Sequence, residues 1–481
     1  MVTQLNFKGT FFYIRGKNAV ADRSRCNTGY GGMQMKKIRK EMVYILLISL
    51  IIMSAGLLFN DNVWFDETYT LALIRHDVSE ITDILRSDMH PPLYFAGLKL
   101  FCSVFGYHII VTKLFSVIGF VLLLLLGILY IRKDYGDQIC IFYFLIIGAV
   151  PFSFYFSVQQ RCYSWSMFFV TWCFLEGMRL VRHRRWTNAV LFAVAALGAA
   201  YNHIYALIAV AGTVLCLNGW IWFRQRGLWR KIVVADFIMI LGYLGWLRIL
   251  LLQTKKAAET FWQVSLEKDS LVVLAFTVVL FTFILFCGTC RFPVICGMLT
   301  ILFVHVAGFG ISLLVRPLYV ARYASPLLGV FAVTAAVAIA PCKERLRSRV
   351  SGYLMIVLIA GYIVGAGFEY NGSLRNFRQD FDQEVSREDV FLYNDSSFGI
   401  MSYYYPENRH ICTYWQPWFA AFACVEYGTG DDLITLIQTD APVWYVANEK
   451  TEIPAWVQKW NGKKEFSFRS DFNEFGVWRL Q

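Results

Sequence analysis

The segment "NVWFDETYTLALIRHDVSEITDILRSDMHPPLYF", residues 62–95, follows directly after a long apolar run. It begins with two adjacent carboxylates, Asp66 and Glu67, and it ends with His90, two prolines and an apolar stretch. The fold depends on how this acidic, proline-marked segment is placed relative to the apolar runs on either side of it.

The composition predicts a membrane protein. Of the 481 residues, 57% are hydrophobic and only 16% are charged. A soluble domain cannot bury that much apolar surface, so we expect a polytopic membrane protein. The formal net charge is +11. In a membrane protein such an excess reflects Lys and Arg in cytoplasmic loops, and we therefore expect no nucleic-acid partner.

Apolar stretches and basic clusters together predict the topology. A helix needs about 20 apolar residues to cross a bilayer. The candidate spans are 41–59, 109–131, 138–157, 163–181, 187–201, 203–222, 232–252, 270–290, 292–315, 323–341 and 350–368. Clusters of Lys and Arg precede the first span and follow every even-numbered span. With eleven spans all clusters lie on one side, which the positive-inside rule assigns to the cytoplasm. We expect an inner (plasma) membrane protein with a cytoplasmic N-terminus and an extracytoplasmic C-terminus.

The same count divides the chain into regions. Residues 1–40 are predicted to be a cytoplasmic tail, and residues 41–368 a transmembrane domain whose first external loop is 60–108. The apolar piece 91–106 is too short for a span and starts with prolines, so we expect a helix in the outer interface. The tail 369–481 is polar and aromatic with short strand-like runs, which predicts a small extracytoplasmic α/β domain. The predicted fold class is thus an all-α polytopic membrane protein with a C-terminal α/β domain.

Several ionisable residues gather on the predicted external face: Asp66, Glu67, His90, Arg161, Arg316 and Arg322. Basic residues are normally scarce there, so these cations indicate an anionic partner such as a phosphate at the membrane surface. An acid beside a phosphate-binding cluster suits a transferase, because it can take a proton from an acceptor hydroxyl while the cations stabilise a departing phosphate. In the simpler interpretation the acids cap the following helix and the arginines snorkel to the interface.

Two motifs in the first external loop resemble a known family. "WFDETYT" (64–70) followed by "DMHPPLYF" (88–95) is similar to the first external loop of the dolichyl-phosphate-mannose protein mannosyltransferases and their bacterial relatives, including the aminoarabinose transferases. These enzymes belong to the GT-C superfamily. "QQRCYSW" (159–165) and "ARYASP" (321–326) are similar to the family's two external Arg-Tyr elements. The resemblance covers residues 41–340 and implies a GT-C-like catalytic domain.

The resemblance implies an inverting transfer of a hexosyl or pentosyl group. The expected partners are a polyprenyl-phosphate-linked sugar donor, a hydroxyl acceptor on a glycan, lipid or protein, and membrane lipids. Asp66 would be the general base, and Glu67 would position the acceptor or the sugar. The other candidates are the phosphate-binding residues Arg161, Arg322, His90 and Lys113 and the substrate-binding residues Asp88, Tyr163 and Tyr323. No cofactor is required and no metal ligands are assigned, although a divalent metal is compatible with acids that meet a phosphate.

Two features depart from the family, and two other functions stay open. Lys113 stands where the family usually has Arg, and Lys lacks bidentate phosphate geometry. Loop 253–270 is too short for the folded insert of animal and fungal members. This favours a bacterial type of member and speaks against protein as the acceptor. A transporter or flippase for lipid-linked saccharides would use intramembrane ionisable residues such as His305, Asp236 and Arg248. A non-catalytic membrane assembly protein would use the tail as a binding module.

Overall fold

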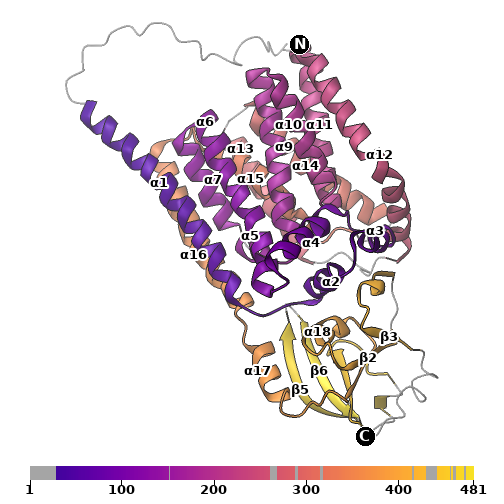
Figure 1. Ribbon diagram of the computed structural model, residues 1–481. Helices are drawn as coiled ribbons and strands as arrows, with labels where there is room; N and C mark the ends of the chain where they lie inside the picture. Colours follow the sequence, from indigo (N-terminus) through magenta and orange to yellow (C-terminus); the bar gives the residue numbers. More distant parts are fainter. Residues whose placement is uncertain are drawn as a thin grey trace, which may run out of the picture.

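The computed structural model describes residues 29–150, 152–260, 268–287, 291–314, 318–413, 417–428, 441–454, 457–458, 462–470 and 473–480. Long helices form a bundle in its upper part, and a sheet domain built from the C-terminal part of the chain lies below it (Figure 1). The predicted fold class, a helical membrane protein with a small C-terminal α/β domain, is confirmed.

Each predicted span coincides with a helix in the described part of the chain. These helices are α1 (Gly29–Gly56), α5 (Ile109–Leu126), α7 (Asp137–Ala149), α9 (Tyr163–His183), α10 (Trp186–Ala200), α11 (Ile204–Arg224), α12 (Trp229–Thr260), α13 (Lys268–Phe286), α14 (Phe292–Leu314), α15 (Leu328–Ile339) and α16 (Glu344–Glu369). Among the described residues, 8 helical segments are long and apolar enough to cross a membrane, so the protein is a multi-pass membrane protein. The apolar helices α7 and α10 are shorter than that. The count of eleven spans stays a prediction.

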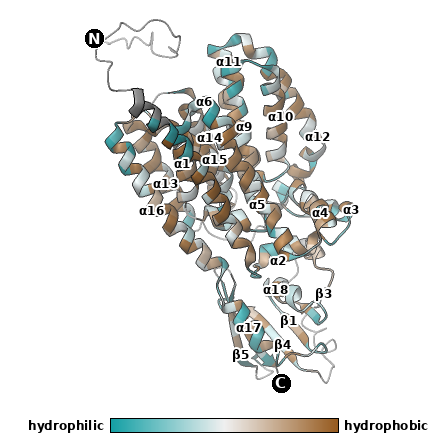
Figure 2. Ribbon diagram, turned by 60° about the vertical axis from the view of Figure 1, so that its left-hand side comes forward, coloured by the Kyte–Doolittle hydropathy of each residue, from teal (hydrophilic) through white to brown (hydrophobic). Residues whose placement is uncertain are grey.

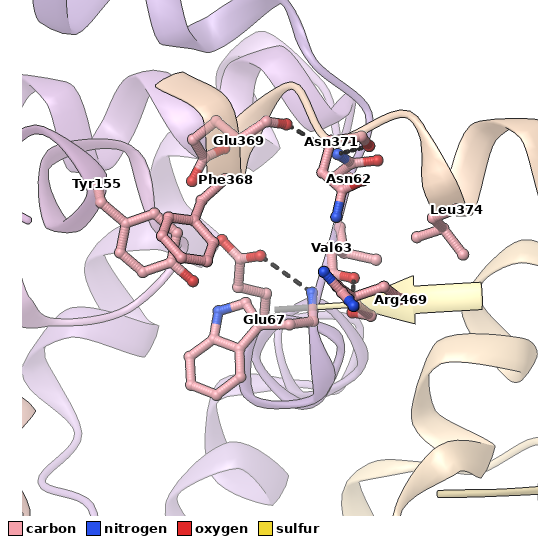
Figure 3. A pocket seen from close by; sticks show the side chains of 11 residues that line it. Asn62, Val63, Glu67, Tyr155, Phe368, Glu369, Asn371, Leu374 and Arg469 are labelled. Atoms are coloured by element: carbon pink, nitrogen blue, oxygen red, sulfur yellow. Dashed lines mark hydrogen bonds between the residues drawn. The ribbon is translucent and has the colours of Figure 1, made fainter. Parts of the chain in front are cut away.

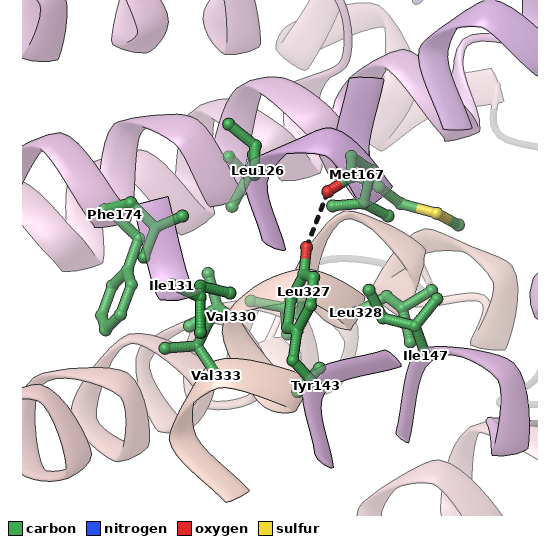
Figure 4. Packing of buried hydrophobic residues seen from close by; sticks show 14 of the residues in the cluster. Leu126, Ile131, Tyr143, Ile147, Met167, Phe174, Leu327, Leu328, Val330 and Val333 are labelled. Atoms are coloured by element: carbon green, nitrogen blue, oxygen red, sulfur yellow. Dashed lines mark hydrogen bonds between the residues drawn. The ribbon is translucent and has the colours of Figure 1, made fainter. Parts of the chain in front are cut away.

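The bundle is held together by buried apolar side chains and close helix contacts. Figure 4 shows part of this core, in which Leu328, Val330 and Val333 of α15 pack among apolar residues of neighbouring helices. At Gly329 of α15, an added Cβ would lie 1.9 Å from Oγ1 of Thr171 in α9. Small residues therefore let these helices approach closely, which is how helices associate where lipid removes the hydrophobic driving force.

Three helices of the predicted external loop lie between the bundle and the sheet domain (Figure 1). They are α2 (Phe65–Leu73), α3 (Val78–Ser87) and α4 (Leu93–Phe105). Helix α4 has 13 residues, as many as α7, and it differs from α7 in following two prolines, as expected for a helix in the outer interface. It buries Phe95 and Leu98 while leaving Leu100 and Val104 exposed. An exposed apolar face on a short helix suits a position in the membrane interface.

The C-terminal domain is a six-stranded mixed sheet with the order β3-β2-β1-β4-β6-β5. Its strands are β1 (Val390–Tyr393), β2 (Arg409–Cys412), β3 (Val425–Tyr427), β4 (Val443–Asn448), β5 (Lys463–Ser470) and β6 (Asn473–Leu480). Neighbours among β1 to β4 pair in parallel, whereas β6 pairs antiparallel with β4 and β5. Every residue of β1 is buried, as expected for a parallel strand covered on both faces. Helices α17 (Ser373–Phe381) and α18 (Ser397–Tyr404) pack on the sheet.

Basic residues from several elements lie at the end of the bundle away from α2–α4. This end contains the short helix α6 (Arg132–Tyr135), drawn at the top of the bundle in Figure 1. Arg132 donates from Nη1 to the Tyr44 hydroxyl at 2.7 Å, and Arg179 donates from Nε to Oδ2 of Asp134 at 2.5 Å. Figure 2 shows that the middle of the bundle is mostly hydrophobic. The grouping of the basic residues agrees with the predicted cytoplasmic side.

A reporter that is active only outside the cytoplasm tests this orientation. Fused after Gln481, it should be active, because the positive-inside rule places the basic end of the bundle in the cytoplasm. The same reporter fused after Lys343, between α15 and α16, should be silent. The reverse pattern would mean that one span is miscounted, either the piece 91–106 (α4) or the pair 187–222 (α10 and α11).

Candidate active site

The first turn of α2 directs its two carboxylates into different surroundings. Consecutive residues of a helix point about 100° apart, so Asp66 and Glu67 cannot share one face. The side chain of Asp66 is 20% exposed, and its Oδ2 lies 3.3 Å from Nη2 of Arg322. Glu67 is buried. The adjacent acids therefore belong to two separate clusters.

Arg161 connects the segment before α9 with α2 and with the end of the first external loop. Its Nη1 donates to the backbone carbonyl of Asp66 at 3.2 Å and to Oγ1 of Thr70 at 3.3 Å. Its Nη2 donates to Nε2 of His90 at 2.7 Å. Within the described part of the chain, its buried Nε has no hydrogen-bond partner. Arg161 thus fixes α2, and its Nε is a buried donor without a partner among the described residues.

The "DMHPP" motif supports Arg161 through a short relay. Oδ2 of Asp88 accepts hydrogen bonds from the Tyr69 hydroxyl and from Nδ1 of His90, each at 2.7 Å. Because Nδ1 carries the hydrogen, Nε2 of His90 is left as the acceptor for Arg161, an assignment that follows from the hydrogen-bond network. Burial opposes ionisation of Asp88, but the electrostatic and hydrogen-bond contributions of His90 and Tyr69 outweigh it and lower its pKa to about 2. Asp88 is therefore a charged anchor for His90.

Arg322 and Tyr323 lie in a short 3-10 turn, Ala321–Leu327, that precedes α15. The Arg322 guanidinium lies 5.1 Å from the centre of the Trp64 ring, in addition to its contact with Asp66. Its side chain is 24% exposed. Of the two arginines, Arg322 is thus the more accessible. The Tyr323 ring lies 5.4 Å from the ring of His203.

Tyr163 and His203 complete this side of the site. Tyr163 is buried at the first position of α9, and its ring centre lies 6.3 Å from that of His203. His203 precedes α11 and accepts the Tyr205 N–H on Nδ1 at 3.2 Å. Among the described residues, the structure therefore brings together the predicted site residues other than Glu67 and Lys113, and it adds His203. The sequence feature that could have pointed to His203 is its position in "YNH" (201–203), a polar turn on the predicted external face.

Lys113 belongs to the second cluster. It is 0% exposed. Its Nζ donates to Oδ1 of Asn60 at 2.6 Å, to the Asn62 carbonyl at 3.1 Å and to Oε2 of Glu369 at 3.3 Å. Its three N–H groups are thus matched by three partners inside the protein, and the structure does not bring it to Arg161 and Arg322. Glu369, the last residue of α16, was missed because it stands at the end of an apolar stretch, where a charge normally marks the exit from the membrane.

Glu67 accepts backbone hydrogen bonds with both oxygens. Its Oε2 accepts the Trp64 N–H at 3.2 Å, and its Oε1 accepts the Gln160 N–H at 3.0 Å. Burial raises its pKa to about 8; Lys113 opposes the rise and Glu369 adds to it. The helix-cap interpretation therefore applies to Glu67, whose carboxyl bonds the residue just before α2. The Asp66 carboxylate instead faces Arg322.

The remaining candidates are placed as follows. Arg316 lies outside the described residues. In that described part, no three His, Cys, Asp or Glu side chains are arranged to hold a metal ion. His305 contacts the Tyr319 hydroxyl through Nδ1 at 2.9 Å and Oγ1 of Thr277 through Nε2 at 3.0 Å. Asp236 lines an apolar groove of about 400 Å³ between α10, α11 and α12.

Comparison with known proteins places the fold. No protein-family model matches the sequence, and no curated protein sequence matches it. Among solved structures, ArnT from Cupriavidus metallidurans in the apo state matches with a TM-score of 0.64 and 13% identity, over 92% of this chain and 98% of ArnT. The chain has the fold of ArnT. ArnT bound to undecaprenyl phosphate matches with a TM-score of 0.60 and 13% identity, over 94% and 98% of the two chains. The ArnT fold thus extends over both the bundle and the sheet domain, in agreement with the GT-C resemblance.

Proposed function

We propose that this protein is a membrane glycosyltransferase that moves a sugar from a polyprenyl-phosphate-linked donor to a hydroxyl acceptor on the outer face of the inner membrane. One observation carries the proposal: Asp66 lies 3.3 Å from Arg322, while Arg161 bonds the Asp66 carbonyl. An acid and two guanidinium groups are thereby joined on one end of a membrane bundle. The ArnT fold, found also in a structure bound to undecaprenyl phosphate, supports a lipid-phosphate donor.

The proposed reaction is a single displacement with inversion. The donor phosphate would compete with Asp66 for the Arg322 guanidinium, because arginine forms strong charge-assisted hydrogen bonds with phosphate. Asp66 would then be released to take the proton of the acceptor hydroxyl. The acceptor oxygen attacks the anomeric carbon, the bond from that carbon to the phosphate oxygen breaks, and the bonding electrons leave with the phosphate. Arg322 and Arg161 would stabilise the charge that develops on the phosphate.

The remaining residues have supporting roles in this scheme. Asp88 and His90 would hold Arg161 in place through their hydrogen-bond relay. Tyr323, which is partly exposed, would pack against the sugar, and the buried Tyr163 would support this side of the site. The two guanidinium groups supply positive charge, so the reaction needs no cofactor; a divalent ion at Asp66 would be a second source of that charge.

Labelled donor lipids separate this function from its alternatives. Purified protein is incubated with polyprenyl-phosphate hexose or pentose, with and without a lipid or glycan acceptor. A transferase should consume the donor, release polyprenyl phosphate and label the acceptor. A flippase would move the donor across a vesicle without consuming it, and an assembly protein would do neither. An intact donor under all acceptor conditions would overturn the proposal.

A further inference from the structure

The segment just before α2, residues 60–64, is held by the bundle on one side. Lys113 donates to Oδ1 of Asn60 and to the Asn62 carbonyl, at 2.6 and 3.1 Å. Asn60 in turn donates from Nδ2 to Oε2 of Glu369 at 2.8 Å. Residues of α5 and α16 thus fix the backbone that leads directly to Asp66.

The C-terminal domain holds the same segment from the other side. Ser470 of β5 donates to the Val63 carbonyl at 2.9 Å, and Tyr404 of α18 donates to the Asp61 carbonyl at 2.6 Å. The Asp61 carboxylate also pairs with Arg378 of α17 at 3.0 Å. Figure 3 shows Val63, Glu67, Glu369 and Arg469 around the small pocket where the two parts meet.

Glu67 extends this network to the neighbour of Arg161. Its Oε1 accepts the N–H of Gln160, and the Gln160 side chain donates from Nε2 to Oγ1 of Thr112 at 2.7 Å. Thr112 precedes Lys113 in α5. The network therefore fixes both the first turn of α2, with Asp66, and the segment that carries Arg161.

The charges of the cluster balance only with a proton. Glu67 and Glu369 are 4% and 6% exposed, and Lys113 is fully buried. Two carboxylates and one ammonium would leave a net buried negative charge, which is costly away from water. The pocket between the two acids has a volume of about 30 Å³, enough for one water through which a proton could pass. One of the two acids is therefore expected to be protonated at neutral pH.

We propose that Glu67, Lys113 and Glu369 form a buried cluster that positions Asp66 and Arg161, and that the cluster does so while it holds one proton. Lys113 and Glu369 are then positioning residues, which act through the first turn of α2. The link to catalysis rests on the proposed function, because it assumes that Asp66 and Arg161 act on substrate. The protonation of the cluster does not depend on that assumption.

The titratable surroundings of Glu67 contain no second buried cation among the residues named here. Besides Lys113 and Glu369, Arg469 and Tyr155 line the same pocket (Figure 3). Tyr403 and Tyr404 of α18, Tyr94 of α4 and Asp66 on its own helix also lie near Glu67. The side chain of Arg469 is 58% exposed and lies 4.0 Å from Glu474. It is therefore screened by solvent, and Lys113 remains the buried cation of the cluster.

The sign of the pH effect follows from the raised pKa. Glu67 titrates near 4.5 when unperturbed and at about 8 in the folded protein, chiefly because of burial. The folded state therefore binds more protons than the unfolded state between these values. The stability that the protonated cluster contributes is complete below about pH 4.5, decreases as the pH rises toward 8 and is gone above it.

Thermal unfolding of the full-length protein between pH 6 and 9 tests the charge balance. The wild-type midpoint should fall between pH 6 and about pH 8 and level off above that pH. In Glu369→Gln this fall should disappear, because Glu67 and Lys113 then form a neutral pair without a proton. Glu176→Gln is the matched control: Glu176 is equally buried in α9, bonded by Tyr130 and Asn188, and should keep the wild-type profile. An unchanged fall in Glu369→Gln, or its loss in the control as well, would overturn the proposal.

A second pair of variants tests the same balance by rescue. Lys113→Met leaves the two acids without their cation and should lower the unfolding midpoint at pH 8. Adding Glu369→Gln to Lys113→Met removes one acid and should restore part of that loss. If the double variant is less stable than either single variant, Lys113 and Glu369 contribute independently, and the cluster is not balanced by charge.

The activity measurement asks whether the cluster positions the catalytic groups. Wild-type kcat should fall from pH 7 to pH 9, and Glu369→Gln should remove that fall. At pH 8, Lys113→Met should lower kcat by about 10–100-fold, more than it changes the donor KM, because a small misplacement of reacting groups is enough for such a loss. Equal pH profiles in an active enzyme would overturn the inference. The predicted unfolding profiles without transfer from any donor would instead overturn the proposed function.

Discussion

Replacing Asp66 by Asn should lower turnover by about 10²–10⁴-fold, the range expected when general-base help is lost. Asn keeps the shape of the side chain and removes its basicity. Protein amount and membrane insertion should stay normal, because the Asp66 side chain is partly exposed and its ion pair with Arg322 contributes little to folding. Donor binding should change far less than kcat, since Arg161 and Arg322 remain.

The control for this variant is Asp83→Asn in α3, on the same external loop. Asp83 is 68% exposed and pairs with Arg86, so its loss should leave turnover unchanged. Glu67→Gln should be milder than Asp66→Asn, because the Glu67 carboxyl is buried and bonded to backbone. Near-normal turnover in Asp66→Asn together with an inactive Glu67→Gln would mean that the two roles are exchanged. If neither variant loses activity, the enzyme hypothesis loses its main support.

Replacing Arg322 by Lys should raise the donor KM by about 10–100-fold, the loss expected when one charge-assisted hydrogen bond is removed. Lys keeps the charge, but an ammonium does not offer the two parallel N–H groups that match a phosphate. Steady-state kinetics with varied donor lipid measures the effect. Arg86→Lys, at a site whose side chain is 56% exposed in α3, should leave the donor KM unchanged.

Arg161→Lys extends the same test to the second arginine. It should also weaken donor use, and it should in addition lower kcat, because the bonds from Arg161 to Thr70 and His90 are lost. An unchanged donor KM in both Arg→Lys variants would return these residues to the interpretation in which they snorkel at the membrane interface.

The helical part of the fold was predictable because apolar length and the placement of Lys and Arg are strong signals. Every predicted span contains a helix, and the short piece 91–106 became α4. The sheet order was not predictable. The runs "DVFLYND" and "PVWYVANE" did become β1 and β4, but their parallel pairing joins residues such as Val390 and Val443 that are distant in sequence. Local patterns contain no information about such partners.

The grouping of the candidate site residues was predictable where short motifs contain them. Asp66, Asp88, His90, Arg161 and Arg322 all belong to motifs on the predicted external face, and the structure joins them. The second cluster was not predictable, because it depends on which side of a helix faces the protein. A lysine at the start of one apolar helix and a glutamate at the end of another both look like boundary residues, until the register of the helices buries them together.

The bond from Ser470 to the Val63 carbonyl joins positions 407 residues apart, and it sets the order of events during biosynthesis. At ribosomal speeds of about 5–20 residues per second, Val63 is made roughly 20–80 s before its partner. Throughout that interval the segment before Asp66 already follows α1 but lacks its bond to Ser470. A nascent or truncated chain would therefore be inserted but incomplete, and the proposed activity should arise only when the final strands have been made and have docked.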